Sequence, residues 1–210
     1  MFFSAGMREE AMTGTRNLPA AHYNERMLVL RYAYALALAV WTGGMIVLGA
    51  IVAPAIFQVL PMHEPEAGRA LAGAAFGDII ARFHYVAYAS GAVMLAALGA
   101  MALLGPRPRH LAIRMGLIAA MLIVALYSGV VVLGEIDGIQ RELANTASST
   151  GARSTPTLRT ILPSQLPADD RRRLRFDALH TLSTRLMMIN VAGALVLLFW
   201  EAREEVGSRK

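Results

Sequence analysis

Long apolar stretches separated by short polar segments dominate the pattern of this chain. Four of them approach or exceed the roughly 20 residues that a helix needs to cross a hydrocarbon core about 30 Å thick. Pro54 lies inside the first stretch and predicts a kink there. The last stretch is strongly apolar only from Leu186, but its helical periodicity extends back through His180, so we expect it to begin as an interfacial helix. The pattern predicts helices over about residues 32–60, 83–104, 111–134 and 178–200.

The polar segments predict how these helices are connected. Residues 1–26 are polar and mixed, and we expect a disordered N-terminal extension. Two prolines between residues 105 and 110 cannot continue a helix, so the second and third helices should form a tight hairpin. Ser, Thr, Ala and Pro dominate residues 143–166, a composition that indicates a linker outside the membrane. The four-helix transmembrane domain then covers residues 27–205, and residues 206–210 form a tail.

Composition supports a lipid environment. Hydrophobic residues make up 56% of the 210-residue chain and charged residues 17%, and the mean hydropathy is +0.47. A soluble domain is nearer half apolar and a quarter charged, so the excess apolar surface must face something other than water. The absence of cysteine excludes disulfides, thiolate metal sites and cysteine nucleophiles. The predicted fold class is therefore an all-α, integral membrane four-helix bundle, with the lipid bilayer as its main partner.

The net charge of +5 raises the question of nucleic-acid binding. The basic residues flank the apolar stretches, and no aromatic side chains are interleaved with them as in nucleic-acid-binding signatures, so we expect no nucleic-acid partner. The numbers of basic residues on the two sides of the predicted membrane are equal. The short turn between the second and third helices carries Arg107 and Arg109, with Arg114 just beyond, and no acid. This asymmetry favours cytoplasmic termini in a bacterial-type inner membrane.

Small residues predict close helix packing. Helices in lipid approach one another through small side chains and polar bridges, because the bilayer offers little hydrophobic drive for their association. The pairs Ala87 and Gly91, and Gly116 and Ala120, are spaced four apart, and Gly43 and Gly44 lie in the first helix. Such surfaces suit a compact bundle, and a homo-oligomer or another membrane partner remains an alternative use of them.

A polar stripe runs along the fourth helix. Its members fall within a sector of about 80° at 3.6 residues per turn, so they share one face, which we expect to point into the bundle. In the second helix Asp78 and Arg82 have the spacing of an ion pair with the acid first. In the third helix Ser128 and Glu135 lie seven residues apart on one side. The stripe consists of His180, Ser183, Met187, Asn190 and Ala194.

Counting membrane crossings places His84, Glu135 and His180 in the same leaflet. Two histidines and a carboxylate are suitable metal ligands, and two facing histidines are suitable axial ligands of a haem, so these three residues are candidates for metal binding and His84 and His180 for haem binding. The interpretation we favour is that no cofactor is bound and that each histidine only hydrogen-bonds or reaches toward the membrane surface, with haem or metal binding as the alternative. Ser183, Asn190, Asp78 and Arg82 would complete a polar cluster.

Motifs of common enzyme classes are absent. The chain has no G-x-x-x-x-G-K-S/T phosphate loop and no G-x-S-x-G nucleophile elbow, which favours a non-enzymatic protein without catalytic residues. Four helices could still line a conduit, so transport of a small solute is a further alternative.

Short motifs in the apolar segments resemble a known family. They are Gly43-Gly44, Ala53-Pro54-Ala55-Ile56-Phe57, Ala67-Gly68, Phe83-His84-Tyr85, and His180 with Ser183 and Asn190. Together they resemble the transmembrane protein 205-like family, a four-helix membrane domain of unknown function, over about residues 32–200. That family is distantly similar to copper-resistance-protein-D-like and haem-binding membrane families. The resemblance thus implies a multi-pass membrane protein without an established catalytic activity, and it raises haem or copper as a cofactor.

Overall fold

The computed structural model describes residues 18–65, 67–104, 110–149 and 163–208, and the described residues form helices without any strand. The helices form four long rods, and the first and the third rod each consist of three consecutive helical segments. The elements are α2 (Leu18–Val47), the π-helical η1 (Leu48–Val52), α3 (Ala53–His63), α4 (Gly68–Leu104), α5 (Leu111–Leu126), the π-helical η2 (Tyr127–Val132), α6 (Leu133–Ser149), the short 3-10 turn η3 (Pro163–Gln165) and α7 (Arg171–Ser208).

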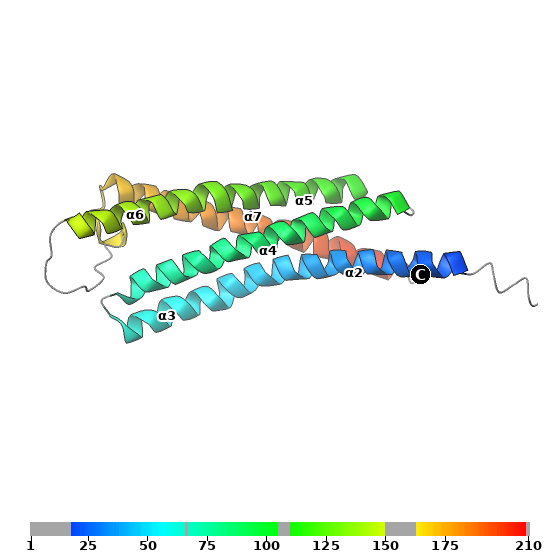
Figure 1. The fold of residues 1–210 in the computed structure, drawn as a ribbon, viewed down its shortest axis with the longest axis horizontal. Helices are drawn as coiled ribbons and strands as arrows, with labels where there is room; N and C mark the ends of the chain where they lie inside the picture. The colour runs from blue at the N-terminus through cyan, green and yellow to red at the C-terminus, as the bar shows by residue number, and fades with distance from the viewer. Residues whose placement is uncertain (1–17, 66, 105–109, 150–162, 209–210) are drawn as a thin grey trace, which may run out of the picture.

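Four long rods lie side by side and alternate in direction (Figure 1). Each contains a stretch long and apolar enough to cross a membrane, namely residues 24–63, 68–104, 111–143 and 171–204. Around the bundle, α2 packs against α4 and α7, and α5 packs against the same two helices. The expected all-α fold with four membrane-spanning helices is therefore confirmed.

The first rod differs from expectation at its start and at Pro54. Helix α2 begins at Leu18, within the segment predicted to be disordered, and Pro19 suits its first turn because the backbone N–H that proline lacks has no partner there. Residues 1–17 of that segment lie outside the described residues. At Pro54 the rod continues through η1, a widened turn directly before the proline. The wider turn is where the chain accommodates the hydrogen bond that Pro54 cannot donate.

The extramembrane helices are longer than expected. The third rod continues past residue 134 and ends at Ser149, so the first part of the predicted linker is helical. Ile139 and Leu143 explain this extension, because both are buried and α6 packs against α7. Residues 150–162 of the predicted linker lie outside the described residues. Helix α7 runs without interruption from Arg171 to Ser208, so it covers most of the predicted tail as well.

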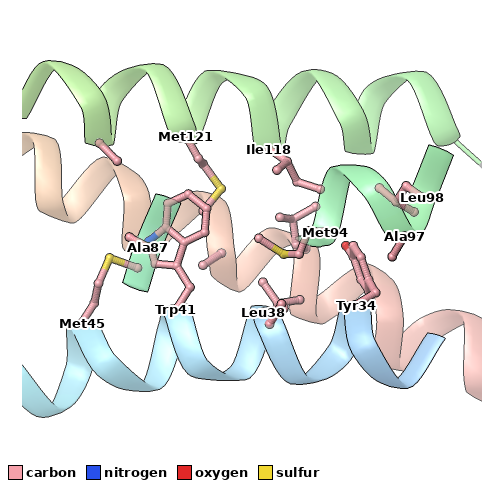
Figure 2. Packing of buried hydrophobic residues seen from close by; sticks show 14 of the residues in the cluster. Tyr34, Leu38, Trp41, Met45, Ala87, Met94, Ala97, Leu98, Ile118 and Met121 are labelled. Atoms are coloured by element: carbon pink, nitrogen blue, oxygen red, sulfur yellow. The ribbon is translucent and has the colours of Figure 1, made fainter. Parts of the chain in front are cut away.

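Large side chains fill the centre of the bundle. Tyr34, Leu38 and Trp41 point inward from α2 and meet Met94 of α4 and Ile118 of α5 (Figure 2). Many other large apolar side chains are exposed along the rods, as lipid contact requires, including Val93, Ile123, Val130, Leu195 and Phe199.

Close helix contacts depend on particular glycines. A methyl group at Gly91 would lie 2.5 Å from Leu122 Cδ2, and one at Gly44 would overlap the ring of Phe83. These glycines let neighbouring helices approach, as the spacing of small residues predicted. Gly43 and Gly116 face open space instead, so they do not contribute to the helix contacts among the described residues.

Candidate functional site

The polar stripe of α7 changes its surroundings along the helix. Asn190 is 5% exposed and Ala194 is completely buried, so this part faces the bundle interior. Ser183 and Met187 are half-buried, whereas His180 is exposed. The side-chain oxygen Oδ1 of Asn190 has no hydrogen-bond partner in the described part of the chain. The inner half of the stripe is therefore a polar position in an apolar core, and its outer half lies at the surface.

His84 lies where α4 meets the π-helical segment η2. Its Nδ1 is 2.9 Å from the carbonyl oxygen of Ile80, and its ring lies against Gly129, where a methyl group would be 2.6 Å from His84 Cδ2. The ring of Tyr88 meets His84 edge to face, and the Tyr88 hydroxyl donates to the carbonyl oxygen of Ala125 at 3.3 Å. The His84 ring and the Tyr88 hydroxyl thus both lie against Gly129 of η2. Widened π-helical turns such as η2 are frequent at functional sites.

The residues predicted to share a metal ion with His84 have other partners. Glu135 accepts a hydrogen bond from Arg175 at 3.1 Å, and the ring of His180 stacks on Phe176 with the ring centres 6.2 Å apart. Within the described ranges, no group of three or more His, Cys, Asp or Glu residues is arranged to hold a metal ion, so the structure does not bring His84, Glu135 and His180 together as such a site. Haem ligation by His84 and His180 stays a prediction.

Asp78 and Arg82 form an ion pair at the expected spacing. Arg82 Nε is 2.9 Å from Asp78 Oδ2, and both side chains are more than half exposed. An exposed pair contributes about 0–1 kcal/mol to stability. This pair marks the surface at the end of the bundle that also holds Glu135 and Arg175, and its place in a polar cluster stays a prediction.

A second polar cluster lies at the opposite end of the bundle. Arg114 projects from the first turns of α5 and its side chain is only 4% exposed. Its Nη1 is 3.2 Å from Glu201 Oε2, and its Nη2 is 3.3 Å from Glu204 Oε1. Tyr34 of α2 interacts electrostatically with all three and is 1% exposed. We call Tyr34, Arg114, Glu201 and Glu204 the Arg114 cluster.

The Arg114 cluster contains buried polar atoms without partners. The hydroxyl group of Tyr34 and the Nε atom of Arg114 have no hydrogen-bond partner among the described residues. Buried polar groups are normally satisfied, and each exception needs an explanation such as an ordered water or a bound ion. Charged residues within membrane helices are costly and mark functional positions by default. Among the described residues, the Arg114 cluster is therefore the strongest candidate site.

A signal for this cluster was present in the sequence. The stripe of α7 repeats every seven residues. One series of steps runs from His180 through Met187 and Ala194 to Glu201. A second series runs from Ser183 through Asn190 and Leu197 to Glu204. In the third rod the same step from Glu135 and Ser128 leads back through Met121 to Arg114. The charge count grouped Arg114 with the arginines of the turn because it lies close to the start of its helix. The seven-residue step would have placed it inside the bundle.

The start of α7 is stabilised by its own cap. Asp170 accepts hydrogen bonds from the backbone N–H of Arg172 at 2.8 Å and from its guanidinium at 2.9 Å. These hydrogen bonds from Arg172, the side-chain bond first, lower the pKa of Asp170 below its usual value. Arg173 and Arg175 in the same turn bind the carbonyl of Leu166 and the carboxylate of Glu135. Much of this basic segment is thus engaged inside the protein.

Four long apolar rods with lipid-suited outer faces define the class: this is a multi-pass integral membrane protein. The chain belongs to the family described as Domain of unknown function (DUF4149), whose model matches residues 36–145. The match covers the last part of α2 and all of α3, α4 and α5, with His84 and Arg114 inside it and α7 outside it. Comparisons with curated proteins and with solved structures returned no match.

Proposed function

We propose that this chain is a non-enzymatic, transmembrane protein 205-like membrane protein that moves protons or small monovalent cations, with the Arg114 cluster as its binding site. One observation carries the proposal: a guanidinium that is nearly inaccessible to solvent faces two carboxylates inside a bundle of apolar helices. This proposal takes up the solute-transport alternative and assigns its site to the end of the bundle opposite Glu135 and His180.

The charges of the cluster favour a positively charged ligand. When Arg114, Glu201 and Glu204 are all ionised, one positive group faces two negative groups, and one negative charge is left over. Coulombic attraction is stronger in a low-dielectric surrounding than in water, so the excess charge favours uptake of a proton or a monovalent cation. Two carboxylates are few for a divalent ion such as Ca²⁺, which takes six to eight oxygen ligands.

The position of the cluster suits exchange with water. The side chains of Glu201 and Glu204 are 27% and 37% exposed, whereas Arg114 is 4% exposed. The two carboxylates thus lie between the buried guanidinium of Arg114 and the surface at the end of α7. Arg107 and Arg109 belong to the turn at this end, which supports placing it, with both termini, on the cytoplasmic side of a bacterial inner membrane.

The test is ion flux in proteoliposomes that contain a pH-sensitive dye and carry an imposed potassium diffusion potential. We expect the wild-type protein to acidify or alkalinise the lumen according to the sign of the potential. Glu204→Gln removes the excess negative charge and should lower the flux at least tenfold. Asp78→Asn is the matched control, because it neutralises an acid of an exposed ion pair at the other end, and it should keep wild-type flux.

Sodium and potassium gradients at constant pH separate cation movement from proton movement. The proposal would be overturned if vesicles with the wild-type protein showed the same fluxes of protons, sodium and potassium as empty liposomes. Equal losses in Glu204→Gln and Asp78→Asn would show that the flux does not depend on the Arg114 cluster.

A further inference from the structure

Asn190 places an amide group near the middle of the fourth membrane helix. It lies eleven residues before Glu201 and ten after His180, about 16 Å and 15 Å along the helix axis at 1.5 Å per residue. The side chain is 5% exposed and its Oδ1 has no hydrogen-bond partner among the described residues. A carbonyl-type oxygen at this depth cannot reach bulk water, so it requires a donor that enters the bundle.

The helices that pack on α7 carry further hydroxyl groups. Helices α2 and α5 and the segment η2 all contact α7. Thr42 of α2 is 3% exposed and donates to the carbonyl oxygen of Leu38 at 2.8 Å, which leaves its own oxygen able to accept a hydrogen bond. Ser128 of η2 is 7% exposed. Buried side-chain oxygen atoms therefore lie on two elements that pack against α7, in addition to the one on α7 itself.

We infer that the side-chain oxygen of Asn190 binds a water molecule at the midpoint of a proton path between the Arg114 cluster and the opposite end of the bundle, and that water molecules entering from each end deliver the proton to it and take it up from it. This inference rests on the proposed function and names the proton as the transported species. Water is small, has two donors, and passes a proton by accepting one on its oxygen and releasing another from it, so no other reactant is consumed. Buried waters of this kind typically satisfy polar groups that protein atoms leave without partners.

An apolar layer separates Asn190 from the Arg114 cluster. Ala194 and Leu197 separate Asn190 from Glu201 on the inward face of α7, and both are completely buried. Leu38 and Ile118, also completely buried, come from α2 and α5, which both pack against α7. Protons therefore pass only when the helices separate at this apolar layer, and the water at Asn190 lies on its far side from the Arg114 cluster.

Asn190→Leu tests the inference because it replaces the amide by an apolar group of similar size. A water site predicts at least a tenfold lower proton flux in the dye-loaded proteoliposomes, together with a melting temperature equal to or higher than that of the wild type, since an unsatisfied polar group has been removed. Asn190→Ser restores an oxygen at this position and should recover part of the flux. Ala192→Ser is a matched control, because Ala192 is exposed on the outer face of α7, and it should leave the flux unchanged.

The outcomes separate this inference from the proposed function. Flux that Glu204→Gln abolishes and Asn190→Leu leaves unchanged would overturn the Asn190 relay and leave the proposed function standing. Flux carried by sodium or potassium without protons would also overturn the relay alone. Wild-type vesicles without any ion flux would overturn both.

Discussion

Arg114 Nη1 lies 3.2 Å from Glu201 Oε2, and this contact joins the beginning of α5 to the end of α7. At the other end of the same two rods, Arg175 of α7 lies 3.1 Å from Glu135 of α6. The two ion pairs have opposite polarity, because the arginine comes from the third rod at one end and from the fourth rod at the other. The third and fourth rods are thus connected by charge at both ends, with the apolar core between.

Arg114→Met should destabilise the protein by about 2–3 kcal/mol. Breaking a fully buried ion pair by removing one partner costs about 3–5 kcal/mol, and partial exposure of the two glutamates reduces this cost. The change in unfolding free energy, or the melting temperature in a mild detergent, measures it. Arg82→Met, in an exposed pair, should cost no more than about 1 kcal/mol.

Adding Glu201→Gln and Glu204→Gln to Arg114→Met should recover part of the lost stability, because the carboxylates then no longer repel each other without a cation between them. Equal melting temperatures for Arg114→Met and Arg82→Met would contradict the assignment of Arg114 as the centre of a buried ionic cluster.

Gly129→Ala should destabilise the protein by about 1–3 kcal/mol through overpacking. The added methyl group would overlap the Tyr88 hydroxyl and press on the ring of His84. Gly134→Ala is the matched control in the same rod, because nothing lies within 4 Å of a methyl group there and alanine favours a helix by up to about 1 kcal/mol. Thermal unfolding in detergent measures both, and a stabilising Gly129→Ala would show that this contact yields without cost.

Much of the fold was predictable because apolar residues in lipid must lie on long helices. The four spans, the hairpin between α4 and α5 and the inward position of Asn190 all follow from periodicity. The π-helical segments η1 and η2 were not predictable in the same way, since a widened turn depends on neighbours such as Tyr88 and His84 that approach from another helix. The helical start at Leu18 and the extension to Ser149 were missed because local polarity suggested chain without structure.

The candidate site was predictable only in part. The residues that attracted attention were histidines and acids inside or beside apolar segments, and these lie at the end of the bundle that holds Glu135 and Arg175. Arg114 has a chemical type that commonly flanks a membrane helix, so its inward direction could be found only by continuing the seven-residue repeat. The pairing of Arg114 with Glu201 depends on how two distant helices are arranged, which the periodicity of either helix alone does not determine.

Lowering the pH should loosen the start of α7. The pKa of Asp170 is lowered in the folded protein by hydrogen bonds from Arg172, so the carboxylate stabilises the cap above its ordinary pKa of 3.8. This contribution is lost as the pH falls below that value through the lower folded pKa. Hydrogen exchange of the amides after Asp170 should therefore be slow at pH 6 and faster, relative to the intrinsic rate, near pH 3. Asp170→Ala should show the fast relative rate at both pH values, and protection unchanged by the substitution would contradict this role.

Single-cysteine labelling tests the proposed orientation, because the chain contains no cysteine that would react in the background. Arg203→Cys reports on the end with the Arg114 cluster, and Glu64→Cys reports on the opposite end. Both parent residues are exposed. With cytoplasmic termini, a membrane-impermeant maleimide should label Glu64→Cys in bacterial cells made permeable only at the outer membrane. It should label Arg203→Cys only after the inner membrane is opened. The reverse pattern would place the Arg114 cluster on the outer side, and the wild-type chain, which should remain unlabelled under both conditions, is the control.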